Sequence, residues 1–267
     1  MAKQTGLVRY TGTMGGVRHF KIKGLQGDFA GIAGGPSAEQ IKNDPAFIRT
    51  RENMKEFGGC ASVAKTVRIG LASILKQMAD SRIAGRMTAI MKKIQLEDTA
   101  NPRGQRAITV TASTSTLEGL DYNKNISLAG VFNAPYTLTS TVARDSATFT
   151  IPAFNPGNYI TAPSGATHFR LVNAINVVSD WKYNPSTTEY EATDPTLSEL
   201  NDVQYSGYLD LSAVTANTVI TTTLPGSPTM TATVSVMNNI GIEFYQAVGS
   251  DYYLFSAGNA LTCQELF

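Results

Sequence analysis

The stretch NDPAFIRTRENMKEFGG, residues 43–59, opens the helical part of this 267-residue chain and carries both ends of a predicted helix. Asp44 followed by Pro45 indicates a helix start, because an N-cap carboxylate accepts hydrogen bonds from free amides and proline fits the first helical position. Gly58 and Gly59 predict the helix end, since glycine adopts the left-handed conformation that terminates many helices. The stretch between them mixes phenylalanines with charges of both signs, which is typical of a docking surface.

Two more helices are expected directly after this one, so that residues 44–94 form a three-helix unit. The first has apolar residues at the helical spacing i, i+3, i+4, i+7. These are Cys60, Val63, Ala64, Val67, Leu71, Ile74, Leu75 and Met78. The second begins at a cap, Asp80 or Ser81, and has the stripe Ile83, Met87, Ile90, Met91 and Ile94. Met54, Met78, Met87 and Met91 are expected to fill a core, because methionine adapts to irregular gaps.

Residues 6–35 predict a small glycine-rich β meander. The expected strands are GLVRY, VRHFKIK and GDFAGIA, which begin at residues 6, 17 and 27. Gly15 or Gly16 supplies the positive φ that a tight hairpin turn requires. Ser37 and Gln40 then have the spacing of a capping box at a helix start.

Beyond the turn-rich segment 95–106, the apolar pattern changes to the period of two that strands show. The expected strands are TLTSTV, ATFTI, HFRLV, TVITTTL, MTATVSV, GIEFYQ and DYYLF. Turn-forming clusters such as NPGN and LPGSP separate them. The sequence therefore predicts an α+β protein whose C-terminal half is an antiparallel β-sandwich, immunoglobulin-like or jelly-roll.

The charge of the chain divides at the same place. Residues 1–106 hold 18 Lys and Arg against 8 Asp and Glu, a net +10, and residues 107–267 hold 4 against 13, a net −9. We therefore expect a basic β/helical assembly region at 1–106 and an acidic β-sandwich domain at 107–267. Halves of opposite sign attract within a molecule, between copies, or toward a charged partner.

No catalytic motif accompanies this organisation. His19 and His168 lie outside any metal-ligand spacing, and the GxSxG nucleophile motif is missing. Cys60 and Cys263 lie far apart, and we expect two buried, reduced thiols. The sequence predicts no catalytic residue, no cofactor and no metal, and therefore a protein that is not an enzyme.

Two segments leave a binding role open. The acidic stretch EYEATDPTLSELND, residues 189–202, could supply calcium ligands, but it lacks the EF-hand order, and a solvated loop is the preferred interpretation. Trp181 and Tyr183 could form a platform for a sugar ring, although one Trp near a Tyr in a strand more often packs in a core.

Basic residues crowd the helical region and make nucleic acid a possible partner, since phosphate binding needs such clusters. They are Arg49, Arg51, Lys55, Lys65, Arg68, Lys76, Arg82, Arg86, Lys92 and Lys93. No nucleic-acid motif accompanies them. A solvated basic face and a face that meets an acidic neighbour are the other two interpretations.

Membrane insertion and secretion are not predicted. No apolar run approaches eighteen residues, so no membrane span is expected. The start MAKQTGLVRY lacks the apolar core of a signal peptide, which predicts cytoplasmic synthesis. Release in a phage-like particle or by lysis stays open.

The segments Gly12–Lys21, Asn43–Gly58 and Gly241–Gln246 together resemble a family of uncharacterised Bacteroidota proteins. Members have a glycine-rich start, an NDPAFxRTRENxxEFG segment and a β-rich C-terminal half with a G(I/V)EFYQ motif. The resemblance implies a bacterial origin and the same two-part layout. It implies no chemistry, so no site residue follows from it.

Taken together, these patterns predict a structural protein that assembles with itself, such as a particle, tube or filament subunit. Seven residues are the expected interface: Phe47, Arg49, Arg51, Glu52, Lys55, Glu56 and Phe57. The phenylalanines would anchor the contact, and the charges would give it direction. The alternative is a non-enzymatic binding module for nucleic acid or glycan.

Overall fold

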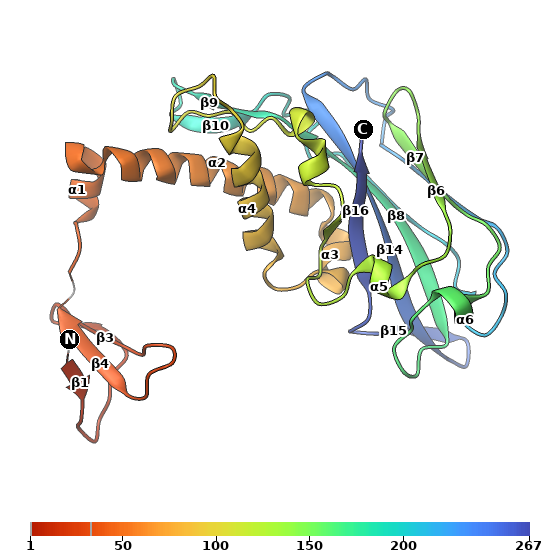
Figure 1. The fold of residues 1–267 in the computed structure, drawn as a ribbon, viewed down its shortest axis with the longest axis horizontal. Helices are drawn as coiled ribbons and strands as arrows, with labels where there is room; N and C mark the ends of the chain where they lie inside the picture. Colours follow the sequence, from red (N-terminus) through yellow and green to blue (C-terminus); the bar gives the residue numbers. More distant parts are fainter. Residues whose placement is uncertain (1, 33) are drawn as a thin grey trace. The chain divides into compact units, whose positions relative to one another are not determined.

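The computed structural model describes residues 2–32 and 34–267. It contains two compact units, Met1–Arg51 and Glu52–Phe267, so the division differs from the boundary expected at residues 106 and 107. Residues 97–107 form a loop, but the helices before it and the strands after it share one apolar core. The predicted α+β class is confirmed: a small N-terminal β region precedes helices and a β-rich C-terminal half (Figure 1).

The N-terminal unit contains a four-stranded antiparallel sheet in the order β1-β4-β3-β2. The strands are β1 (Ala2–Gln4), β2 (Gly12–Met14), β3 (Val17–Phe20) and β4 (Asp28–Ile32). Gly15 and Gly16 have φ values of 57° and 78°, which confirms the predicted hairpin turn. Of the third expected strand, 27–33, the residue Ala33 lies outside the described residues.

The expected strand at Gly6–Tyr10 is wrong, because these residues form a loop between β1 and β2. Two contacts hold the end of this loop. Arg9 Nη1 lies 3.2 Å from Asp28 Oδ2, and the Tyr10 amide donates to Gln4 Oε1 at 3.0 Å. The tip of the loop is apolar and exposed, with Leu7 at 106% and Val8 at 66% of full exposure.

This N-terminal sheet has no apolar core of its own. Among residues 2–32 and 34–51, the buried side chain is that of Asp28, and every apolar side chain is half-buried or exposed. The most exposed are Leu7, Val8, Leu25 and Ile32. A sheet of this size normally needs a packed apolar face to be stable, so this unit lacks the main source of folding free energy.

Two short helical turns complete the unit. α1 (Ala38–Asn43) begins with the predicted capping box, in which Ser37 Oγ accepts from the Gln40 amide at 3.1 Å. η1 (Pro45–Phe47) follows, with the Asp44 carboxylate accepting from the Ala46 amide at 2.8 Å. The predicted Asp-Pro start is therefore confirmed, as a 3-10 turn that leads into α2.

Helix α2 (Ile48–Gly70) is continuous, so the predicted helix end at Gly58 and Gly59 is wrong. Gly59 serves close packing instead. A Cβ added at Gly59 would lie 2.5 Å from Cγ of Tyr190, and one added at Gly70 would lie 3.0 Å from Cβ of Asn176. A glycine in a helix is thus required where a ring or another side chain touches the helix backbone.

Two further helices, α3 (Ala72–Met78) and α4 (Ile83–Leu96), complete the helical layer. The stripe Cys60–Met78, predicted on one helix, is divided between α2 and α3 at Leu71. The stripe Ile83–Ile94 lies on α4 as predicted, and most residues of both stripes are buried in one core. Met78, Met87 and Met91 are fully buried as expected, whereas Met54 is exposed. Within the described ranges, none of the helices combines the length and apolar character that spanning a bilayer requires.

The β-rich half contains two packed antiparallel sheets, which agrees with the predicted sandwich. The large sheet has the order β11-β8-β14-β16-β5, with β12 beside β8 and β15 beside β14. Its strands are β5 (Leu120–Asp121), β8 (His168–Ser179), β11 (Asn201–Tyr205), β12 (Leu209–Asp210), β14 (Val234–Val248), β15 (Asp251–Leu254) and β16 (Ala260–Leu266). The small sheet has the order β13-β7-β6, from β6 (Thr137–Ser140), β7 (Ser146–Ile151) and β13 (Thr218–Thr223).

The remaining elements are short. They are η2 (Val110–Ala112), η3 (Thr114–Thr116), α5 (Leu128–Val131), α6 (Pro156–Tyr159) and the hairpin of β9 (Trp181–Asn184) and β10 (Glu189–Ala192).

The central strands β8 and β14 are covered on both faces, because successive residues of a strand point to opposite sides. Val172 and Ala174 of β8 belong to the core shared with the helices. Leu171 packs instead in the core shared with the small sheet, together with Phe149 and Ile220. Figure 1 shows the helices on one side of the large sheet and β6 and β7 on the other.

Buried asparagines cross these layers. Asn173 Nδ2 donates to the carbonyls of Ala147 and Ile220, at 3.1 and 3.0 Å, and so ties β8 to the small sheet. On the helical side, Asn239 Nδ2 donates to Asn176 Oδ1 at 2.9 Å, and Tyr122 donates its hydroxyl to Asn239 Oδ1 at 2.7 Å. Buried amides with several partners fix the register of the central strands.

The two adjacent glycines of α2 give a matched test of this packing. Gly58→Ala is expected to stabilise the protein by about 0.5–1 kcal/mol, because it adds a better helix former where no atom lies within 4 Å of the new Cβ. Gly59→Ala is expected to destabilise it by about 1–3 kcal/mol, because the Tyr190 ring must move. Denaturant unfolding of both variants measures the difference, and equal effects would contradict the close contact.

Candidate functional site

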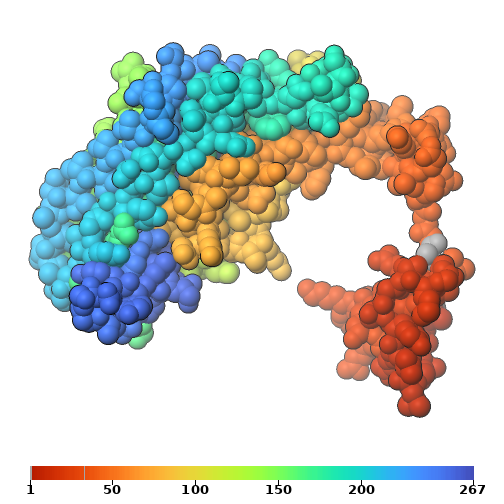
Figure 2. Space-filling view, turned by 180° about the vertical axis from the view of Figure 1, so that it is seen from behind, coloured from red at the N-terminus to blue at the C-terminus, as the bar shows by residue number. Residues whose placement is uncertain are grey.

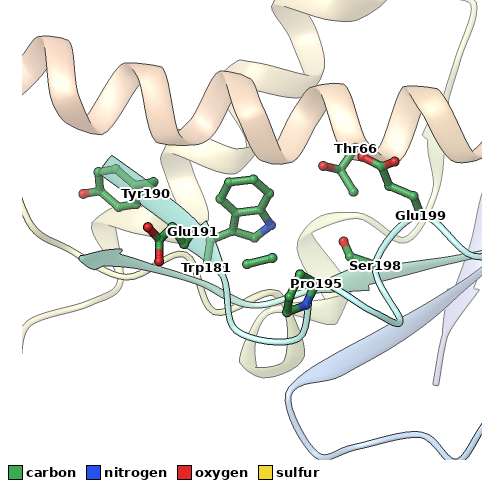
Figure 3. Close-up of a pocket in the computed structure, with 8 residues that line it drawn as sticks. Thr66, Trp181, Tyr190, Glu191, Pro195, Ser198 and Glu199 are labelled. Atoms are coloured by element: carbon green, nitrogen blue, oxygen red, sulfur yellow. The ribbon is translucent and has the colours of Figure 1, made fainter. Parts of the chain in front are cut away.

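The most distinctive surface feature of the C-terminal unit is a pocket between α2 and the β9–β10 hairpin. It has a volume of about 510 Å³. The lining residues are Thr66, Trp181, Tyr190, Glu191, Ala192, Pro195, Ser198 and Glu199. Figure 3 shows the Trp181 indole lying between the hairpin and the helix, with Tyr190 and Ser198 on either side. In Figure 2 the teal residues near 190 lie against the orange of α2.

The hairpin is held in place by its first strand. The amide of Ile108 donates to the Trp181 carbonyl at 2.9 Å, and the Trp181 amide donates back to the Ile108 carbonyl at 3.0 Å. Asp180, one residue earlier, accepts from the amide of Thr111 at 3.0 Å and from its hydroxyl at 2.7 Å. β10 is the outer strand, since β9 is its sole partner strand in the described structure. Its outward edge therefore presents backbone groups to an incoming chain.

Two polar atoms in the pocket lack a hydrogen-bond partner although they are buried. They are Trp181 Nε1 and Ser198 Oγ. An indole N–H is a donor and cannot accept, and a hydroxyl donates or accepts, so both can bind an acceptor oxygen. A buried donor without a partner costs free energy, which a ligand with a carbonyl or carboxylate oxygen would recover.

The rim of the pocket is acidic. Glu191 and Glu199 line it, and Glu189 follows on the other side of Tyr190. Hydrogen bonds from Asn184 and Thr187 lower the pKa of the Glu191 carboxyl, at 2.9 Å and 2.7 Å respectively. Glu191 is therefore charged at neutral pH, and the rim favours a cationic partner.

A second pocket of about 320 Å³ lies on the other side of Tyr190. It is lined by Met54, Lys55, Gly58, Gly59, Ser62, Thr188, Glu189 and Tyr190. Met54, Gly58, Ser62 and, in the first pocket, Thr66 are each one helical turn apart on one face of α2. The two pockets lie along α2 and β10 and are separated by the Tyr190 ring, which packs against Gly59. We refer to the pair together as the α2–β10 groove.

A buried network of charged and polar side chains holds the Tyr190 hydroxyl. Glu56 is 1% exposed and accepts a hydrogen bond from Lys92 Nζ and another from the Gly104 amide at 2.8 Å. Gln95 links Lys92 to Tyr190: its Oε1 accepts from Lys92 Nζ at 2.8 Å, and its Nε2 donates to the Tyr190 hydroxyl at 3.1 Å. The wall of the groove is therefore rigid at its centre.

Opposing effects act on the pKa of the Glu56 carboxyl. Burial alone would raise it, but the hydrogen bonds from Lys92 and Gly104, with the charges of Lys92 and Arg106, outweigh burial and lower it. Burial raises the pKa of the nearby Cys60 thiol to about 12, and burial also raises that of Cys263. Both cysteines are free and buried, as predicted, and at neutral pH both are protonated thiols.

Six of the seven predicted interface residues, Arg49 to Phe57, lie on the first turns of the continuous helix α2, and Phe47 ends η1 directly before it. The prediction that Glu56 belongs to an interface is wrong, because its side chain is buried in the network above and cannot meet a partner. Phe57 is 61% exposed, so it does not anchor the fold of its own chain.

Most charged residues among the predicted interface residues already contact groups of their own chain. Arg51 donates to the carbonyls of Ile41 and Asp44, at 2.8 and 2.9 Å. Lys55 Nζ contacts the Tyr183 hydroxyl at 2.9 Å, and Glu52 Oε2 lies 3.5 Å from Arg103 Nε. An interface role for the exposed members stays a prediction.

The basic residues of the helical region likewise divide into two groups. Arg86 and Lys92 are used internally: Arg86 binds Asp80 at 2.7 Å together with the carbonyls of Asp121 and Tyr122, and Lys92 binds Glu56. Lys65, Lys76, Arg82 and Lys93 are exposed. The cationic surface is thus smaller than the sequence indicates.

A cluster of aromatic residues at the end of the large sheet was missed by the sequence analysis. The rings of Tyr208 and Tyr252 stack with centroids 3.8 Å apart and an interplanar angle of 3°. Arg170 lies 4.0 Å from the Tyr205 ring centroid and 5.1 Å from that of Tyr208. Tyr208, Tyr252 and Tyr253 are exposed. These residues come from β8, β11, β15 and a loop, so their spacing along the chain gave no signal.

The acidic stretch 189–202 is not gathered into a metal site. In the part of the chain that the structure describes, no three His, Cys, Asp or Glu side chains are grouped to hold a metal ion. Asp194 is occupied by the Thr196 hydroxyl at 2.9 Å, the Leu197 amide at 3.2 Å and the Thr231 hydroxyl at 3.1 Å. This segment instead supplies one wall of the α2–β10 groove.

Comparisons with protein-family models, with curated proteins and with solved structures found no match for this chain. The resemblance of the segment Asn43–Gly58 to Bacteroidota proteins therefore stays a prediction.

Replacing Glu56 by Gln tests the buried network. Because the folded pKa of Glu56 lies below its ordinary value of 4.5, its ionised form stabilises the fold above about pH 4.5, and this contribution is lost as pH falls through the folded pKa. Glu56→Gln is expected to cost about 3 kcal/mol at pH 7, the low end for breaking a buried pair, because the Lys92 side chain keeps 30% exposure.

Urea unfolding at a series of pH values measures this effect, with Glu189→Gln, an exposed carboxylate of β10, as the control. The difference between wild type and Glu56→Gln should shrink as the pH is lowered. A difference that stays constant down to acid pH would show that the charge of Glu56 does not stabilise the fold.

Proposed function

We propose that this protein is a structural subunit that assembles with copies of itself, and that its N-terminal unit is the arm that joins them. The observation that carries the proposal is the sheet of residues 2–32, which buries no apolar side chain among its described residues. A sheet of this size without a core gains too little from its own contacts to offset the conformational entropy of ordering it. It therefore requires a surface to pack against.

The exposed residues of the arm suit such a contact. Leu7, Val8, Leu25 and Ile32 are each at least 60% exposed. Apolar side chains concentrated on a small unit are typical of a protein interface. The arm, residues 1–51, holds 8 Lys and Arg against 3 Asp and Glu, a net +5, whereas residues 52–267 hold 14 against 18, a net −4. Opposite charges favour contact between the arm of one copy and the C-terminal unit of another.

The C-terminal unit has the properties of a scaffold. Its two central strands are buried on both faces, and its polar interior is tied by hydrogen bonds between layers. A contact between different surfaces of two copies is heterologous and continues into a ring or a filament. A capsid or tube subunit of a phage-like particle, released by lysis, is the concrete form of this proposal, with the remaining exposed lysines facing nucleic acid.

The second candidate is a non-enzymatic binding module. The stacked Tyr208 and Tyr252 favour it, because exposed aromatic faces bind sugar rings and nucleobases. These rings stack on each other, however, which uses one face of each. Self-assembly is therefore the better-supported function.

Removal of residues 1–36 tests the role of the arm. The truncated protein is expected to stay folded, because the apolar cores lie within residues 52–267, and to lose self-association. Sedimentation velocity over a concentration series and negative-stain microscopy measure assembly, and thermal unfolding checks the fold. Val142→Asp, a change at an exposed apolar residue of the C-terminal unit, is the control and should assemble normally.

Two results would count against the proposal. One is a full-length protein that stays monomeric at every concentration, and the other is a truncated protein that assembles as well as the full chain. A monomer that binds oligosaccharides or single-stranded nucleic acid, and loses binding in Tyr252→Ala, would favour the binding module.

The rate of assembly should depend on salt. The Debye length falls from about 8 Å at physiological ionic strength to about 3 Å at 1 M, so attraction between arm and neighbour is screened. Apolar contacts are not weakened in this way. High salt is therefore expected to slow assembly more than it dissolves finished assemblies, as measured by light scattering. Rates that are unchanged between low and high salt would exclude electrostatic steering.

A further inference from the structure

We propose that the loop Gly6–Tyr10 of one copy binds as an extended strand in the α2–β10 groove of a second copy. This inference rests on the proposed self-assembly and specifies the two surfaces that meet. It follows from a match between the properties of the loop and those of the groove, each described within its own unit.

The loop has the chemistry of an inserting strand. Leu7 and Val8 at its tip are the most exposed apolar pair of the N-terminal unit, at 106% and 66%. The stretch GLVRY has the composition of a β-strand but pairs with no strand of its own sheet. Arg9 beside the tip keeps 57% side-chain exposure, and Lys21, near the same carboxylate of Asp28, keeps 72%. The loop thus presents two apolar side chains next to positive charge.

The groove offers the complementary features. Trp181, Tyr190 and Pro195 supply apolar walls for Leu7, in a pocket of about 510 Å³. Val8, the next residue of the strand, points to the opposite side. Glu191 and Glu199 stand at its rim, where they face a basic partner. The cavity is large enough for a few side chains of a bound segment.

The backbone of an inserted strand also finds partners. β10 is the outer strand of its hairpin, and an extended segment beside it adds a strand through main-chain hydrogen bonds. The same groove side chains then decide specificity, since alternate residues of an added strand point into and out of the pocket.

Site-directed cross-linking between two single-cysteine variants tests the contact. Leu7→Cys and Ala192→Cys are made in the full-length chain, mixed, and treated with a short bis-maleimide. Cys60 and Cys263 are fully buried and do not compete. We expect a covalent heterodimer from the mixture. The matched controls are Met14→Cys with Ala192→Cys and Leu7→Cys with Val142→Cys, in which one partner is an exposed residue outside the proposed contact.

Sedimentation of aspartate variants separates this inference from the function on which it rests. Leu7→Asp is expected to weaken self-association at least tenfold, and Val142→Asp, on the C-terminal unit, less than twofold. If the protein assembles but the Leu7 and Ala192 mixture cross-links no more than the controls, the contact is wrong and self-assembly stands. If the unmodified protein does not assemble either, both the contact and the self-assembly are wrong. A double variant that cross-links within one chain, with no heterodimer in the mixture, would show that the loop fills the groove of its own copy and would also overturn the inference.

Discussion

Burial of β8 and β14 on both faces is the constraint on which the C-terminal unit depends. A strand covered on one side alternates buried apolar residues with exposed polar ones. In β8 and β14 almost every residue is buried, so this alternation is missing. The helices α2–α4 supply one cover and the small sheet supplies the other. The helical layer and the small sheet each have one apolar face, which packs on β8 and β14. Each of these layers therefore depends on the central strands for its stability.

Close approach of these layers is permitted by small residues and fixed by polar ones. Gly59 and Gly70 bring α2 against Tyr190 and Asn176, where any larger residue would force them apart. Glu56, Lys92 and Gln95 then link α2, α4 and β10 in the interior. The floor and one wall of the α2–β10 groove are therefore parts of the folded core, which makes the groove a preformed surface. A preformed surface loses little entropy when a partner binds.

Much of this fold could be predicted from the sequence, and the failures have physical causes. The helical stripes and the period-two strands were found because burial on one side imposes a regular spacing. The helix end at Gly58 and Gly59 was wrong, because glycine signals both a helix stop and a close contact, and Tyr190 lies 131 residues further along the chain. The groove and the stacked tyrosines could not be predicted, since residues far apart in the sequence form them without any fixed spacing.

The missing core of the N-terminal sheet bears directly on the proposed self-assembly. In the proposed assembly, a unit whose described residues bury no apolar side chain gains most of its stability when it meets a partner, so part of the interaction free energy is used to order it. Such an arm binds less tightly than the same apolar area on a rigid surface would. The loss has a consequence for an assembling protein: each contact stays reversible, and misplaced subunits can dissociate before the structure closes. In the proposed ring or filament, strength would come from the number of contacts, because every copy would both donate an arm and receive one. A rigid arm would make each contact stronger and the correction of errors slower.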